Sequence, residues 1–130
     1  MLYFVLRQNG AKDWWSGLKL TEKHTGSAHA IQYHHIFPKS LLKETYDQKE
    51  INEIANMAFI GGKTNRQITN KEPIKYLEDE VVAKRGEDAL ESQLIPTDRK
   101  LWEMANYRDF LAWRRGAIAE AINAFMKRYE

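Results

Sequence analysis

Two short extended segments constrain the fold of this chain more than any other feature. In residues 30–36, alternate side chains fall on one side of an extended pattern, which is typical of a β-strand. Pro38 follows and cannot donate to a sheet ladder, so it ends the strand. Residues 57–60 form a second short apolar run that ends at Gly61-Gly62. We therefore expect a small two-stranded unit built around these segments.

Helical patterns fill most of the remaining sequence. Residues 2–6 fit either a short helix or a strand, and residues 64–69 fit a short helix. Pro73 suits the first turn of a helix over 73–83. Near the C-terminus, apolar side chains recur at helical spacing and predict a core-facing helix: Phe110, Leu111, Trp113, Ile118, Ile122, Phe125 and Met126. The fold class we predict is α+β, with the ββα unit at about residues 30–70 and helices before and after it.

Length and composition exclude several classes of protein. The chain has 130 residues, enough for one domain with its own core, and it shows no internal repeat, so we predict a single domain over 1–130. It has no cysteine, which excludes disulfides, cysteine-bound zinc and cysteine nucleophiles and fits a cytoplasmic protein. No apolar run approaches the roughly 20 residues of a membrane helix, so we expect no membrane partner.

Charge points only weakly to a partner. The net charge is +2, so the whole-chain balance says little about nucleic acid. Locally, four basic residues with one intervening acid gather between positions 63 and 75: Lys63, Arg66, Lys71 and Lys75. Such a cluster fits either a solvated helix face or a surface that contacts phosphates.

Two histidines and two asparagines, in a fixed order along the chain, suggest a catalytic site. A predicted strand ends in His34-His35; Asn56 opens the second strand, and Asn65 stands at a predicted helix start. Phosphodiester hydrolysis needs a base for water and a cation for the phosphate and the leaving oxygen. Neutral imidazole is a suitable base near pH 7, and His and Asn can bind divalent cations. Taken alone, paired histidines are more often capping or surface residues, so the combination and its order carry the prediction.

These residues resemble the HNH, or ββα-metal, nuclease family. Its motif is a catalytic His preceded by a metal ligand and followed by Ile-x-Pro, as in His34-His35-Ile36-Phe37-Pro38. An Asn in a short apolar strand follows, here Asn56. A last ligand near a helix start completes the motif, here Asn65 with Arg66 beside it.

The resemblance is closest to the C-terminal nuclease domain of GmrSD-like modification-dependent restriction proteins. It rests on residues 35–39, Asn56, residues 64–66 and Tyr76-Leu77. Residues 94–96 and the C-terminal helix with Phe110, Leu111 and Arg114 also fit that subfamily. Proteins of this type carry an N-terminal NTP-binding half, which would make this chain the nuclease part of a larger protein.

The resemblance implies a role for each motif residue. His35 would be the general base, and His34 and Asn65 would bind the metal. Asn56 would brace the loop between the strands through hydrogen bonds to the backbone. Phosphate contacts would come from basic residues near the site: Lys63, Arg66, Lys39 and Lys71.

These roles predict a metal-dependent endonuclease that hydrolyses DNA, in restriction of foreign or modified DNA. Mg²⁺ or Mn²⁺ is the expected cofactor; because His34 stands where many relatives have Asp, Ni²⁺ and Zn²⁺ are also admitted. The alternatives are an inactive nucleic-acid-binding module on the same scaffold and a helical domain with incidental histidines. The residues alone leave DNA and RNA open as substrates.

Overall fold

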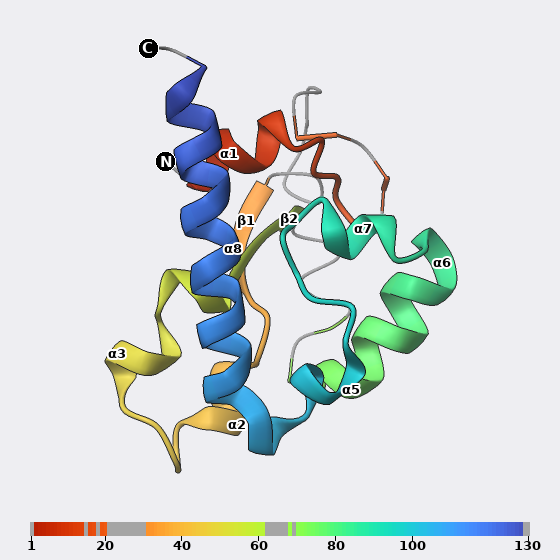
Figure 1. The fold of residues 1–130 in the computed structure, drawn as a ribbon. Helices are drawn as coiled ribbons and strands as arrows, with labels where there is room; N and C mark the ends of the chain where they lie inside the picture. Colours follow the sequence, from red (N-terminus) through yellow and green to blue (C-terminus); the bar gives the residue numbers. More distant parts are fainter. Residues whose placement is uncertain are drawn as a thin grey trace.

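The computed structural model describes residues 2–14, 16–17, 19–20, 31–61, 68 and 70–128. A two-stranded sheet lies near the middle of the fold, with the long C-terminal helix α8 on one side and the α5-to-α7 segment on the other (Figure 1). The buried apolar residues form one cluster that draws on the helices before and after the sheet. The architecture is the α+β fold expected from the sequence.

The chain begins with helix α1, Leu2–Gln8. Its buried residues are Leu2, Val5 and Leu6, whose spacing places them on one helical face. This spacing decides between the helix and the strand that the sequence left open. Trp14, farther along, is buried in the core as an anchor, whereas its neighbour Trp15 lies outside the described residues.

The two predicted strands are present and pair with each other. Strand β1, Ile31–His35, and strand β2, Met57–Gly61, run antiparallel. In their register, His34 faces Ala58 and Tyr33 faces Phe59. The connection contains helix α2 (Lys39–Leu42), helix α3 (Gln48–Ile51) and the 3₁₀ turn η1 (Ile54–Asn56).

Side chains complete the edge of β2 that does not face β1. The Gln93 amide accepts from the Phe59 N–H at 3.3 Å and donates to the Phe59 carbonyl at 2.7 Å, as a neighbouring strand would. The Asp13 carboxylate accepts from the Gly61 N–H at 2.6 Å. Buried backbone polar groups need such partners, so these two side chains allow a two-stranded sheet to lie inside the core.

The predicted helix over 73–83 is present but is not α-helical throughout. Helix α5, Pro73–Tyr76, continues as the π-helix η2, Leu77–Val82, and ends as α6, Ala83–Arg85. Pro73 occupies the first turn as expected, and Leu77 and Val81 are buried. Gly86, with φ of 80°, ends the segment before helix α7, Asp88–Glu91.

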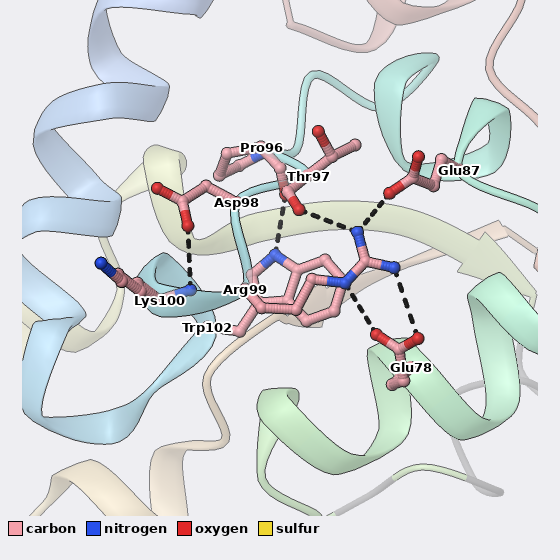
Figure 2. A network of polar contacts seen from close by, with 8 residues as sticks. All are labelled: Glu78, Glu87, Pro96, Thr97, Asp98, Arg99, Lys100 and Trp102. Carbon is pink, nitrogen blue, oxygen red and sulfur yellow. Dashed lines mark hydrogen bonds and ion pairs between the residues drawn. The ribbon is translucent and has the colours of Figure 1, made fainter.

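An ion-pair network ties this helix to the segment that follows α7 (Figure 2). Arg99 pairs with Glu78 of η2 and with Glu87, and it lies over the Trp102 ring at 4.7 Å. The Trp102 indole donates to the Pro96 carbonyl at 2.7 Å. Arg99 and Trp102 are the ends of the 3₁₀ turn η3 (Arg99–Trp102), and a second 3₁₀ turn, η4 (Met104–Asn106), follows it. Since the ion pairs are half-exposed, they contribute little, and the buried indole fixes this turn.

Helix α8, Tyr107–Lys127, carries the predicted apolar stripe. Phe110, Leu111 and Ile118 are buried as expected, but Trp113 and Met126 are exposed. Trp113 lies off the helical face that Phe110, Leu111 and Ile118 share, and Met126 lies in the last turn, beyond the buried residues of the helix. Of the helix expected over 64–69, only Ile68 is described, and it is buried. Among the described helices, none is long and apolar enough to cross a membrane.

Candidate active site

The hairpin places the two adjacent histidines on opposite faces of the sheet. His34 points into the core and is 3 % exposed, whereas His35 is only half-buried. Successive side chains of a strand alternate between faces, so this separation follows directly from β1 being a regular strand. One imidazole is therefore enclosed by protein and the other borders solvent.

Two aromatic rings and a phenol hydroxyl surround His34. The rings of Trp14 and Tyr76 meet its imidazole edge-on, with centroids 6.0 and 5.9 Å away. The Tyr76 hydroxyl lies 3.3 Å from His34 Nε2 and donates its proton to the Ile36 carbonyl at 2.5 Å. Because that phenol has only one proton, it must accept from Nε2–H of His34. In the neutral ring, Nδ1 is then the nitrogen without a proton.

The Tyr76 phenol keeps its proton under ordinary conditions. Burial raises its pKa well above the usual value of 10, and the nearby positive charge of Arg114 lowers it by less. The hydroxyl therefore donates to Ile36 throughout the neutral and mildly alkaline range.

His35 is held by a different partner. Its Nε2 lies 2.9 Å from the side-chain oxygen of Asn52, the residue that follows α3. An amide oxygen only accepts, so His35 Nε2 carries the proton and Nδ1 carries the lone pair. A base oriented in this way presents Nδ1 to a water molecule.

Asn56 joins the two ends of the connection between the strands. Its side-chain oxygen accepts from the Phe37 N–H at 2.8 Å, and its amide donates to the carbonyls of Phe37 and Ile51 at 3.1 and 3.0 Å. The Asn56 carbonyl also accepts from the Ile36 N–H at 2.8 Å. Asn56 is fully buried, so it can act on the site only by positioning the backbone around it.

Arg114 of α8 supports the same segment. Its guanidinium is fully buried and donates to five backbone carbonyls: those of Ile54, Ala55, Met57, Gln93 and Leu94. Burial lowers the pKa of Arg114 to about 9, which still leaves it charged at neutral pH. Leu94, at φ of 59°, adopts a backbone that bulky residues resist, and its carbonyl is one of these acceptors.

A cavity of about 230 Å³ opens beside the histidines. The described residues that line it are Tyr33, His34, His35, Pro38, Lys39, Ser40 and Asn70. Lys39 thus lies with the histidine pair, whereas Lys71 is exposed and is not among the described lining residues. A larger cavity, of about 400 Å³, shares none of these described residues.

Three of the predicted site residues lie outside the described residues: Asn65, Lys63 and Arg66. Their roles, and the expected approach of Asn65 to His34, stay predictions. Within the described part of the chain, no three histidine or carboxylate side chains cluster as metal ligands.

The donor set nevertheless fits a divalent ion of the kind expected. A metal-binding imidazole commonly donates its other N–H to a fixed partner, and the Tyr76 hydroxyl is such a partner for His34. His34 Nδ1 would bind the ion, with Asn65 as the predicted second ligand. Mg²⁺ and Mn²⁺ keep several waters and bind phosphate oxygens, so two protein ligands suffice.

Sequence reasoning missed the residues that position this site. Asn52 lies 17 residues from His35, and Arg114 lies 59 and 60 residues from the two η1 carbonyls that it binds. Asn52 had no signal beyond its place just before Asn56. Tyr76 and Arg114 were noticed as part of the resemblance, but their contacts could not be derived from spacing.

The site is of the HNH nuclease type: a hairpin with adjacent histidines at the end of its first strand and a buried asparagine before its second. Comparison with protein families matches residues 2–121 to the C-terminal domain of GmrSD restriction endonucleases. The chain belongs to this family of HNH-type nuclease domains. Comparisons with curated proteins and with solved structures found no significant match.

Membership defines the general activity. A restriction endonuclease domain implies a nuclease that acts on DNA in modification-dependent restriction. The NTP-binding half expected from the resemblance lies outside this match and stays a prediction.

Proposed function

We propose that this chain is a divalent-metal-dependent endonuclease that hydrolyses DNA phosphodiester bonds with His35 as general base. The observation that carries the proposal is the pair of histidines in one cavity, each held through Nε2 by its own partner, Tyr76 or Asn52. This pairing gives one buried imidazole for a cation and one accessible imidazole for water.

The first step of the proposed reaction uses the imidazole of His35, which Asn52 orients. His35 Nδ1 takes a proton from water, and the hydroxide oxygen bonds to phosphorus. The bond from phosphorus to the 3′ oxygen then breaks, and that oxygen takes a proton from a water molecule, which gives 5′-phosphate and 3′-hydroxyl ends. The Asn52 oxygen stabilises the imidazolium through the Nε2 hydrogen bond. A divalent ion bound here would supply positive charge for the phosphate and the leaving oxygen.

The cavity supplies further contacts for the substrate. Lys39 lines it beside the histidines and is suited to a phosphate oxygen. Lys63, Arg66 and Lys71 are the further phosphate contacts that we propose. A nitrogen ligand at His34 favours Mn²⁺ more than a carboxylate would, and it admits Ni²⁺ and Zn²⁺.

Plasmid cleavage with a panel of divalent ions tests the proposal. We expect nicking and linearisation with Mg²⁺ or Mn²⁺, none with EDTA, and a loss of about 10²- to 10⁴-fold in His35→Ala. Lys43→Ala, a change at an exposed position outside the described cavity lining, is the control and should cleave normally. DNA binding without cleavage under any ion would favour the inactive binding module instead.

A further inference from the structure

A chain of aromatic rings leads away from the histidines along the outer face of the hairpin. The Tyr33 and Phe59 rings pack at 4.5 Å across the two strands. The Phe59 ring meets Tyr3 of α1 at 5.2 Å, and Tyr3 meets Phe4 at 5.9 Å. Phe59 is almost fully buried by this packing, but Tyr33 is 60 % and Phe4 is 55 % exposed.

Tyr33 is the ring of this aromatic row that reaches the active site. It lines the same cavity as His34 and His35. Since it stands two residues before His35 on one strand, both side chains leave the same face, about 7 Å apart along β1. A phosphate placed at His35 would therefore bring its neighbouring nucleoside to the Tyr33 ring.

The packing behind Tyr33 suits a stacking role. Phe59 supports one side of the ring, so its orientation is fixed before a ligand arrives. A cross-strand aromatic pair stabilises a hairpin whether or not it binds anything, but here it leaves the outer ring largely in solvent. Basic groups flank the row, with Lys39 in the cavity and Arg7 over the Tyr3 ring at 5.6 Å. Aromatic rings between cations match a nucleic-acid strand better than an apolar protein surface.

We propose that Tyr33 is a stacking platform for an unpaired nucleobase next to the scissile phosphate, so that in a duplex substrate this base must first leave the helix. The position of that base relative to the phosphate rests on the nuclease proposed above. Bases in a duplex already stack on their neighbours and offer no free face, so a ring of this kind selects bases outside the helix.

A binding experiment without metal tests this independently of cleavage. The probes are a labelled oligothymidylate, an abasic strand with the same number of phosphates, and a duplex containing the same thymidylate strand. Fluorescence anisotropy would give the affinity of each for wild type and Tyr33→Ala. Stacking on one aromatic ring is worth about 5- to 150-fold in affinity.

We expect the affinity of Tyr33→Ala for the oligothymidylate to fall by that factor. Its affinity for the abasic strand and for the duplex should fall by less than about 2-fold. Tyr33→Phe, which keeps the ring, should restore binding, and Trp113→Ala, which removes an exposed ring from α8, should change nothing. Equal losses on intact and abasic strands, or no loss at all, would overturn the inference and assign the rings to a protein surface or to hairpin stability. If Tyr33→Ala loses affinity only for the oligothymidylate, but the wild type cleaves no DNA with any ion, stacking would be upheld and the nuclease proposal contradicted.

Discussion

Removing the Tyr76 hydroxyl is the sharpest perturbation of the proposed metal ligand, because it changes one atom behind His34. In Tyr76→Phe the ring still fills its place in the core. The Ile36 carbonyl loses its 2.5 Å donor, and His34 Nε2–H loses its acceptor. Leaving buried polar groups without partners costs about 1 to 3 kcal/mol each. We expect a loss of this order in the free energy of unfolding.

The effect on metal binding is the distinctive part of the prediction. Without the Tyr76 hydroxyl, the hydrogen bond that fixes the tautomer of His34 is lost, so Nδ1 is held less firmly for the ion. Loss of a partner behind a metal ligand typically weakens binding about 10- to 100-fold. Calorimetric titration with Mn²⁺ measures the affinity, and chemical denaturation measures the stability.

Tyr107→Phe is the matched control. It also removes a phenol that donates to a backbone carbonyl, that of Glu50 at 2.6 Å, but this phenol does not contact His34. It should lower stability and leave Mn²⁺ affinity unchanged. Equal Mn²⁺ affinity in wild type and Tyr76→Phe, with the expected loss of stability, would refute the reasoning about the His34 tautomer.

Three further substitutions test the positioning residues. Asn52→Ala should lower kcat about 10-fold or more, a smaller loss than removal of the base itself, and should leave KM for DNA unchanged. Asn52→Asp should retain most of the activity. A wild-type kcat in Asn52→Ala would show that His35 needs no partner. Arg114→Met should lower the free energy of unfolding, measured by chemical denaturation, by about 3 to 5 kcal/mol because five carbonyls lose their donor. Its control, Arg115→Met, removes an exposed ion pair and should change that free energy by less than about 1 kcal/mol. Asn56→Ala removes three side-chain hydrogen bonds and should cost about 2 to 4 kcal/mol, and a stable, fully active variant would contradict a bracing role.

The elements that the sequence predicted are those with local signals. Alternation and the stop at Pro38 predicted the first strand, and a short apolar run that ends at Gly61-Gly62 predicted the second. From the first strand it follows that His34 and His35 face opposite ways. Residues 2–6 stayed ambiguous because five residues fit either period. Burial of Val5 together with Leu2 and Leu6, while Phe4 is exposed, is what shows the helix. The π-helical turns within the predicted helix could not be predicted, because no residue type in that segment distinguishes them from α-helix.

What the sequence could not predict depends on contacts between distant segments. A buried arginine on α8 is improbable from composition, because its charge is tolerated only where several carbonyls converge. That convergence exists only after η1 and the turn at Gln93 have packed against α8. The Asn52–His35 contact likewise depends on the path of the whole connection between the strands.

Direct detection of the nitrogen ligand tests the central claim, that His34 binds the metal and His35 does not. Pulsed electron paramagnetic resonance of the Mn²⁺-loaded protein reports coupling to a directly bound imidazole nitrogen. We predict one such nitrogen in the wild type, its loss in His34→Ala, and its retention in His35→Ala. A coupling that survives in His34→Ala, or disappears in His35→Ala, would contradict the assignment of the two histidines.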